Sequence, residues 1–587
     1  MYIFHLFRSF LPLHNPIGFG AADFIEIALA GLLVILVLGH ARLEPLAVRF
    51  AVRTGWCMLF LAALAIALRL ALSPAAPVPA PRGADDFSYL LLSDTLAHFR
   101  LANPTHPLHQ FFEWNFVLQQ PAYSSIYPIG PALALAFGQV VFQSPWAGVL
   151  LSSGLFCALC YWMLRGWVTP GWALVGGLLA VCTFGPLCYW TNCYWGGAVS
   201  ACAGCLAFGA LPRLRDHRHI RDAIALGLGV GLQMLSRPYE SVILDLAVLL
   251  FLLPSVRRLG GLLAIAALFV APAVALLAFH NHAVTGSWTT LPYQLSRYQH
   301  GVPTTFTFQS DPVPHDPLNI DQQLYYEGQK AAHDTTPGFL VRLYARLPFT
   351  RFFLLPPLYL AIPFFLLLLR RARYAWVALT VTGFAIGSNF YPYFFPHYVA
   401  AAACLVLLAA VAGLERLSAR SQLAVRWIVM LCAAHFLFWY GLQAVGDERM
   451  INAVSEFGAW DLAAHGDPDR RIAIQAQLQQ APGKQLVFVR YWPQHAYSEW
   501  IHNGADIDSQ RVIMAVDLCP GEDERLIHYY PGRSVWLLEP DAIPPALTSY
   551  EQSSEQPPEA PVNPAGFLSP PRPTNDANHG IVLEQVR

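Results

Sequence analysis

The chain has 587 residues, of which 55% are hydrophobic and only 12% are charged. A soluble domain carries about 25% charged residues, so this composition excludes an ordinary soluble protein and indicates a chain embedded largely in a membrane. The formal net charge of −1 provides no basic field for phosphate backbones and argues against a nucleic-acid partner.

Long apolar stretches recur along the first three-quarters of the chain. A membrane-spanning helix needs about 20 mostly apolar residues. Such stretches lie near 22–40, 55–73, 146–164, 172–190, 196–211, 260–279, 352–369, 374–390, 396–414 and 426–445, with shorter ones at 223–236 and 240–253. The first lacks a small-residue cleavage site and is predicted to be an anchor rather than a removed signal peptide. The sequence therefore predicts an all-α polytopic membrane protein with about twelve transmembrane helices.

Arginine clusters predict the orientation of these helices, because cytoplasmic loops are enriched in Lys and Arg. The clusters alternate between the two sides only if the stretch 126–143 does not cross the membrane. That stretch begins YPIGP, whose two prolines and glycine suit an interfacial or re-entrant helix. Both termini are then predicted to lie outside the cytoplasm. The clusters are Arg42/Arg49/Arg53, Arg165, Arg213/Arg215/Arg218/Arg221, Arg257/Arg258, Arg370/Arg371/Arg373 and Arg416/Arg420/Arg426.

The same topology divides the chain into a membrane part and outer parts. A transmembrane domain is predicted over 1–446, with outer loops at 74–145 and 281–351. Strand-like runs at 486–490 and 534–538 predict a small extracytoplasmic α/β domain over 447–550. The residues 551–587, rich in Pro, Ser, Glu and Asn, predict a disordered tail.

Two adjacent aspartates, Asp85 and Asp86, follow the second apolar stretch within the sequence RGADDFSY. Neighbouring carboxylates repel each other unless a metal ion, a cationic partner or a proton compensates them. They can also serve only as a cap for the following helix, since Asp is a favoured N-cap residue. The loop around them is long, aromatic and rich in histidine, which is more typical of a substrate cover than of a connector.

Two further polar clusters occur at helix ends. Arg237 and Glu240 bracket a Pro-Tyr pair between two apolar stretches, where ionisable groups usually face a bundle interior or a water-filled cavity. They predict either an internal ion pair or a phosphate contact by Arg237. His397 and Tyr398 end the aromatic run NFYPYFFPHY, which is typical of an interfacial belt, although His397 is also a candidate site residue.

These features together resemble the GT-C glycosyltransferases. The shared features are an acidic pair at the outer end of an early helix, a long loop after it, many spans and a non-cytoplasmic C-terminal domain. The segment DDFSY at 85–89 is similar to the Asp-Glu-x-x-Tyr pattern of the lipid A aminoarabinose transferase and protein O-mannosyltransferase group. The segment YPIG at 127–130, with Trp146-Ala147 beginning the next span, is similar to a second landmark. The resemblance covers roughly 55–415 in architecture, but only the first loop in motif.

The resemblance implies a glycosyltransferase whose sugar donor is a membrane lipid, a polyprenyl phosphate that carries the sugar. The acceptor would be a hydroxyl group of a glycan, a lipid or a protein. It implies a bacterial inner (cytoplasmic) membrane, with the active site facing the periplasm or exterior. Asp85 would be the base or a carboxylate near a metal, Asp86 its companion, and the pair would hold any Mg²⁺ or Mn²⁺. Relatives often carry a lysine where this chain has Gln120 and Ile126, so the phosphate contact is expected from Arg237. The expected substrate-binding residues are Tyr89, Tyr127, Arg237, Glu240, His397 and Tyr398.

Two other classes of function are compatible with a polytopic chain. A transporter or flippase of a lipid-linked or small solute commonly shows broken helices at matched positions of two repeats. One such break occurs near 237–240, without a counterpart in the other half. A non-catalytic scaffold that uses its tail to bind partners is disfavoured by the two carboxylates of the first loop.

The predicted topology is tested by reporter fusions along the chain. Fusions after Arg165, Arg215, Arg258 and Arg371 should report the cytoplasm. Fusions after Pro104, Asp311 and Asp467 should report the outer compartment. Opposite results at Arg215 and Arg258 alone would show that the stretch 126–143 spans the membrane.

Overall fold

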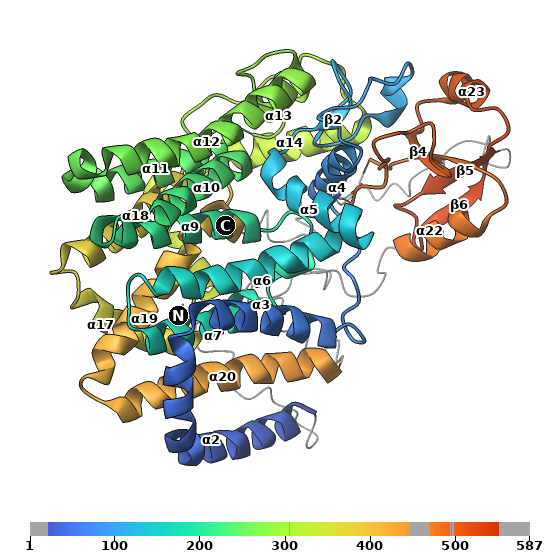
Figure 1. Ribbon diagram of the computed structural model, residues 1–587. Helices are drawn as coiled ribbons and strands as arrows, with labels where there is room; N and C mark the ends of the chain where they lie inside the picture. Colours follow the sequence, from blue (N-terminus) through green and yellow to red (C-terminus); the bar gives the residue numbers. More distant parts are fainter. Residues whose placement is uncertain (1–20, 305, 446–469, 494, 496–497, 551–587) are drawn as a thin grey trace. The chain divides into compact units, whose positions relative to one another are not determined.

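The computed structural model describes residues 21–304, 306–445, 470–493, 495 and 498–550. The chain divides into two compact units, each assembled from three separate stretches of sequence (Figure 1). Unit 1 comprises Met1–Pro79, Pro128–Leu277 and Pro337–Ala463, and unit 2 comprises Ala80–Tyr127, Ala278–Thr336 and Ala464–Arg587. The two predicted outer loops and the C-terminal part of the chain thus supply the three stretches of unit 2.

The described part of unit 1 contains helices and their connections. Its long helices are α2 (Ala21–Ala51), α3 (Thr54–Ala71), α5 (Ile129–Phe142), α6 (Pro145–Leu164), α7 (Pro170–Phe184), α9 (Ala198–Asp216), α10 (Ile220–Ser236), α11 (Pro238–Leu252), α12 (Val256–Thr285, which continues into unit 2), α18 (Ala372–Ser388), α19 (Ala403–Ser418) and α20 (Gln422–Val445). Its short helices are α8 (Tyr189–Asn192), η3 (Leu253–Ser255), α15 (Phe339–Ala345), η4 (Leu347–Phe349), α16 (Thr350–Phe353), η5 (Pro356–Ala361), α17 (Ile362–Leu366) and η6 (Pro396–Ala402).

Small residues bring the helices of unit 1 close together. Helix α6 packs against α3, α5, α7 and α9, and α9 packs in turn against α10 and η6. A Cβ atom on Gly204 of α9 would lie 2.0 Å from the carbonyl oxygen of Ala401, so only glycine permits this approach. Small residues at helix contacts are the usual means of close packing where lipid provides no hydrophobic drive between helices.

Among the described residues, five helices are long and apolar enough to cross a membrane. A sixth span arises if two segments bent by 107° at their junction count as one. Helix α7 stays short, at 15 residues, because Gly185-Pro186 follows it directly. The prediction of a mostly helical chain with several helices able to cross a membrane is confirmed, whereas the number of about twelve spans stays a prediction. The five helices are Thr54–Ala71, Pro145–Leu164, Pro238–Thr285, Pro396–Ser418 and Gln422–Val445, and the bent pair is Phe339–Phe353 with Pro356–Leu366.

Helix α5 occupies the stretch that was predicted not to cross the membrane. It has 14 residues, and at 1.5 Å per residue its length of about 21 Å is less than the roughly 30 Å of a bilayer's hydrocarbon core. Pro128 precedes its first residue in an extended conformation, which sets the start of the helix.

Unit 2 combines helices with two small sheets. Its helices are α4 (Ala84–Ala97), η2 (His109–Phe112), α13 (Pro292–His300), α14 (Ile320–Asp334), α22 (Arg471–Gln480) and α23 (Pro520–Tyr529). Its strands are β1 (Val117–Leu118), β2 (Ser124–Ser125), β3 (Gln485–Val489), β4 (Val512–Val516), β5 (Ser534–Glu539) and β6 (Ala546–Ser549).

The strands predicted near the C-terminus form the middle of a four-stranded sheet. The strand order is β4-β3-β5-β6, with β3 parallel to both of its neighbours and β6 antiparallel to β5. All five residues of β3 are buried, and the four after Gln485 form the apolar run expected of a central parallel strand. Whether 447–550 is a domain of its own stays a prediction.

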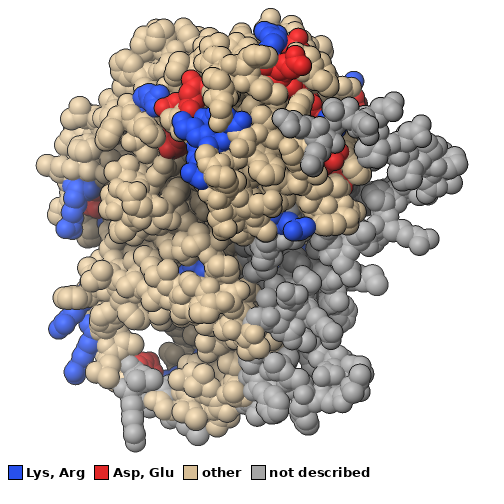
Figure 2. Space-filling model, turned by 90° about the vertical axis from the view of Figure 1, so that its right-hand side faces the viewer, with Lys and Arg blue, Asp and Glu red and all other residues tan. Residues whose placement is uncertain are grey.

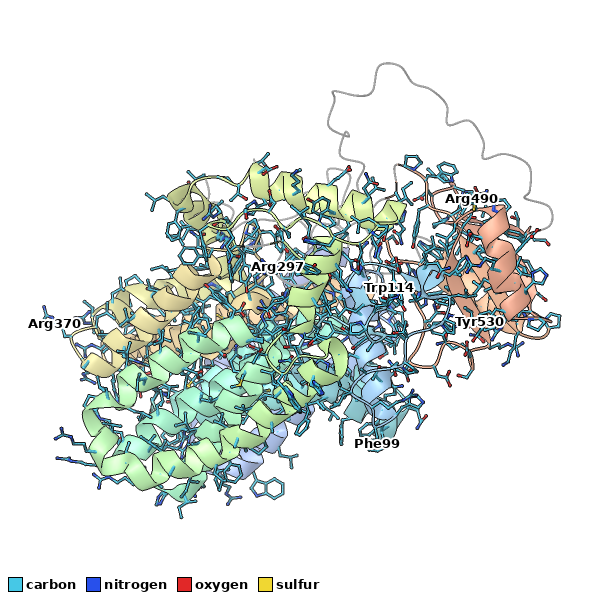
Figure 3. The ribbon with its side chains drawn as sticks, turned by 90° about the horizontal axis from the view of Figure 1, so that it is seen from above. Phe99, Trp114, Arg297, Arg370, Arg490 and Tyr530 are labelled. Atoms are coloured by element: carbon cyan, nitrogen blue, oxygen red, sulfur yellow. The ribbon has the colours of Figure 1, made fainter. Side chains whose placement is uncertain are left out.

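The surface reflects the low charge of the sequence. On the face drawn in Figure 2, uncharged residues cover most of the described surface. Figure 3 shows Phe99, which follows α4, pointing away from its neighbours, and 93% of this residue is exposed.

Candidate active site

Asp85 and Asp86 occupy the first turn of helix α4, where a negative charge interacts favourably with the helix dipole. Only Asp86 acts as a cap. Its Oδ2 accepts hydrogen bonds from the backbone N–H groups of Gly83 at 3.4 Å and Arg82 at 3.3 Å. Asp86 is 7% exposed and is engaged with its own helix terminus. The capping interpretation of the acidic pair therefore describes Asp86 rather than Asp85.

Asp85 is half-buried and points to a different partner. Its Oδ1 accepts a short hydrogen bond from the hydroxyl of Tyr127. Burial raises the pKa of the Asp85 carboxyl to about 6, the hydrogen bond from Tyr127 opposes this rise, and the charge of Asp86 adds to it. A carboxyl with a pKa near 6 can accept a proton close to neutral pH, as a general base must.

Packing within unit 2 fixes the position of Tyr127. Its ring stacks on that of Tyr89, with centroids 4.5 Å apart and planes inclined by 11°. Its backbone N–H donates to Ser125 Oγ at 3.0 Å, and Ser125 Oγ lies 2.7 Å from Ser88 Oγ. Strand β2 is thereby attached to helix α4. The structure thus brings together the predicted residues Asp85, Tyr89 and Tyr127.

The second cluster of predicted residues lies in unit 1, at the break between α10 and α11. Arg237 Nη2 lies 2.6 Å from Glu240 Oε1, and Glu240 is 2% exposed. The hydroxyl of Tyr391 donates to the same Oε1 at 3.3 Å. The guanidinium of Arg237 lies 4.5 Å above the ring of Tyr398, and its buried Nε–H has no acceptor among the described residues. The predicted Arg–Glu ion pair therefore forms, and within the described part of the chain one N–H of Arg237 remains available to a ligand.

His397 and Tyr398 belong to the same cluster. They lie at the start of η6, and their ring centroids are 4.7 Å apart. The Nδ1 atom of His397 lies 3.0 Å from the hydroxyl of Tyr189, which also accepts the backbone N–H of His397 at 3.1 Å. The structure therefore groups four predicted residues, Arg237, Glu240, His397 and Tyr398.

Arg346 is a member of this cluster that the sequence reasoning missed. Its guanidinium donates to the carbonyl oxygens of Ser388 and Tyr391, each at 2.7 Å, and lies 5.2 Å from the ring centroid of Phe394. The available signal was an arginine within the apolar run LVRLYARLPF, close to a Pro residue and aromatic residues.

The eight predicted site residues thus form two groups, one in each unit. Among the described residues, the group of three metal-ligand side chains lies elsewhere, at Asp311, His333 and Asp334. The assignment of Asp85 and Asp86 as metal ligands also stays a prediction.

No family model and no curated protein sequence matches this chain. Solved structures do resemble it. ArnT from Cupriavidus metallidurans in the apo state is 12% identical over 83% of this chain and 93% of ArnT, with a TM-score of 0.45. ArnT bound to undecaprenyl phosphate is 11% identical with the same coverage and a TM-score of 0.46.

A second similar structure is the Archaeoglobus fulgidus oligosaccharyltransferase in complex with Zn and sulfate. It is 13% identical over 74% of this chain, with a TM-score of 0.44. This chain covers 60% of that enzyme's length. ArnT and the oligosaccharyltransferase are GT-C membrane glycosyltransferases, the superfamily that the sequence motif resembles.

Replacing Tyr127 by phenylalanine should raise the pKa of Asp85 above about 6, because burial and the charge of Asp86 then act without the opposing hydrogen bond. A raised folded-state pKa means that the stabilisation by Asp85 is present below the ordinary value of 3.8 and is lost as the pH rises through about 6. The Tyr127→Phe substitution should extend that loss to higher pH.

The measurement is infrared titration of the protonated carboxyl, assigned by its disappearance in Asp85→Asn. Tyr123→Phe is the matched control, because the hydroxyl of Tyr123 donates to the carbonyl of Asn503 and not to a carboxylate. An Asp85 titration that is the same in Tyr127→Phe as in the parent would contradict the assigned hydrogen bond.

Proposed function

We propose that this chain is a membrane glycosyltransferase that moves a sugar from a polyprenyl-phosphate-linked donor to a hydroxyl group of an acceptor on the extracytoplasmic side. The proposal includes about twelve spans in a bacterial inner membrane and a C-terminal α/β domain outside the cytoplasm. The acceptor is a glycan, a lipid or a protein. The observation that carries the proposal is the half-buried carboxyl of Asp85, whose pKa is about 6 and whose partner is a neutral tyrosine.

Asp85 has the properties that the transfer step requires. The acceptor oxygen bonds to C1 of the sugar while the bond from C1 to the phosphate oxygen breaks. The hydroxyl proton passes to the Asp85 carboxylate, and the polyprenyl phosphate leaves with the electron pair of the broken bond. General-base assistance of this kind contributes about 10²- to 10⁴-fold in rate. The neutral hydroxyl of Tyr127 orients the carboxylate without cancelling its charge.

The departing phosphate needs positive charge, which preorganised donors supply effectively. The cluster of unit 1 contains two arginines, Arg237 and Arg346. Glu240 holds Arg237 in place, and no described residue accepts the Nε–H of Arg237, whereas the hydrogen-bond partners of Arg346 are carbonyl oxygens. This chemistry supports both as phosphate ligands, with His397 and Tyr398 shaping the site around them.

The proposed steps use side chains alone. One oxygen of Asp86 accepts backbone N–H groups and one of Asp85 accepts the Tyr127 hydroxyl, and the described residues place no third metal-ligand side chain with the pair. A requirement for Mg²⁺ or Mn²⁺ therefore stays a prediction, to be measured as the dependence of transfer on each ion.

Asp85→Asn should reduce sugar transfer by about 10²- to 10⁴-fold, because the amide keeps the size of the side chain but removes its basicity. Asp86→Asn should have a smaller effect, since an amide oxygen can still accept the backbone N–H groups of Arg82 and Gly83. The assay is transfer of radiolabelled sugars from polyprenyl-phosphate donors in liposomes, at matched folded yield.

Asp94→Asn is the matched control on the same helix. Its Oδ2 accepts the backbone N–H of Ala505, a bond that an amide oxygen can retain. If Asp85→Asn transferred sugar at the parental rate, Asp85 would have no role in catalysis and would act only at the start of helix α4. A parent that transfers no sugar from any donor, yet moves a lipid across the bilayer, would establish the transporter alternative.

The ion pair of Arg237 is tested by neutralising it in two steps. Arg237→Gln alone should destabilise the protein by about 3–5 kcal/mol, because it leaves a buried carboxylate without its cation. The double substitution Arg237→Gln/Glu240→Gln removes both charges and should recover most of that stability. Transfer should stay reduced in the double variant if Arg237 also binds the donor phosphate. Recovery of both stability and transfer would show that the pair is purely structural.

A further inference from the structure

Three metal-ligand side chains meet in the second long loop, apart from both groups of predicted site residues. Asp311 lies between α13 and α14, and His333 and Asp334 are the last two residues of α14. One ligand atom from each lies within 4.8 Å of the others. The side chains of Asp311 and His333 are 17% and 11% exposed, and Asp334 lies at the surface. All three belong to unit 2.

The contact of His333 Nε2 determines which ring nitrogen carries the proton. The Nε2 atom lies 3.3 Å from the carbonyl oxygen of Phe306, which can only accept a proton. In a neutral imidazole the proton is therefore on Nε2, and Nδ1 presents a lone pair. Metal-binding histidines typically donate the N–H of their other ring nitrogen to a carbonyl or carboxylate in this way.

The lone pair of His333 faces a carboxylate oxygen. Nδ1 lies 2.6 Å from Asp311 Oδ1, yet that buried oxygen takes part in no hydrogen bond among the described residues. Two electron-rich atoms at this separation repel each other unless a cation or a proton lies between them.

Asp334 increases the need for positive charge. Its ligand oxygen lies within 4.8 Å of those of Asp311 and His333, so a second carboxylate faces the same space. The negative charges of Asp311 and Asp334 therefore both need a positive charge nearby. A divalent cation placed among the three side chains compensates both carboxylates at once.

We propose that Asp311, His333 and Asp334 bind a divalent transition-metal ion. An imidazole nitrogen combined with carboxylate oxygens suits Zn²⁺ or Mn²⁺, whereas Ca²⁺ and Mg²⁺ are usually held by oxygen ligands alone. Three protein ligands, one of them at the surface, leave a coordination position for water. The ion ties the segment around Asp311 to the end of α14, and so stabilises the long loop independently of any sugar transfer.

The test is zinc binding by the full-length protein in detergent, with no affinity tag. Zinc content is measured by mass spectrometry after equilibrium dialysis, and affinity by competition with a fluorescent chelator. The parent should bind one zinc ion. His333→Gln and Asp311→Asn should each abolish zinc binding or weaken it by at least about 10- to 100-fold, because substitution of a residue that only supports a metal ligand already costs that much affinity. Asp334→Asn should weaken binding as well.

Two further variants separate a metal site from a network of charged side chains. His528→Gln removes an exposed histidine of α23 elsewhere in unit 2 and should leave zinc binding unchanged. Lys330→Gln removes a competing positive charge and should leave zinc binding unchanged or tighten it. Equal zinc content in the parent and in both His333→Gln and Asp311→Asn, each folded as judged by circular dichroism, would overturn the proposal. So would a parent that binds no zinc.

Discussion

The constraint on which the structure depends is that an ionised side chain packed among apolar helices must find compensation inside the protein. Water is not available there, and an uncompensated buried charge costs several kcal/mol. Arg69, which is 1% exposed, meets this requirement with Asn192 Oδ1 at 2.7 Å, two backbone carbonyl oxygens and the ring of Trp146. Arg237 meets it with Glu240.

Asp85 departs from this pattern. Among the described residues that act on its carboxyl, Tyr127 is a neutral donor and Asp86 is a second acid. The raised pKa is the physical consequence, because the protein holds the group without a cation. A carboxyl that served only to stabilise the fold would gain more from an arginine partner. This arrangement is costly for stability and useful for proton transfer, which is typical of functional sites.

Local patterns in the sequence predicted local structure well. The apolar run of β3 and the acidic start of α4 were both visible in the sequence, because strand burial and helix capping depend on neighbouring residues. Helix ends were predicted less well. The stretch 172–190 was taken as one span, but α7 ends at Phe184, where Gly185 and Pro186 stop the helix.

Contacts between distant residues could not be predicted in the same way. Tyr127 lies 42 residues from Asp85, and nothing between them indicates that its hydroxyl reaches that carboxylate. Arg346 was missed because it lies in a predicted loop, and its partners are backbone carbonyls that no side-chain motif marks. The cluster of Asp311, His333 and Asp334 was missed because His333 follows Asp311 by 22 positions, and only the folded loop brings Asp311 to the end of α14.

The two arginines of unit 1 differ in what they offer a phosphate. Glu240 neutralises the charge of Arg237. Arg237 can therefore offer an anion mainly one directed hydrogen bond, from its Nε–H. Carbonyl oxygens satisfy the donors of Arg346 without removing its charge. Tyr391 connects the two, since its hydroxyl donates to Glu240 and its carbonyl accepts from Arg346. The net positive charge of this cluster therefore comes from Arg346, whereas Arg237 offers a hydrogen-bond donor held in place by Glu240. In the proposed reaction the two would act together on the departing phosphate, which gains negative charge as its bond to the sugar breaks.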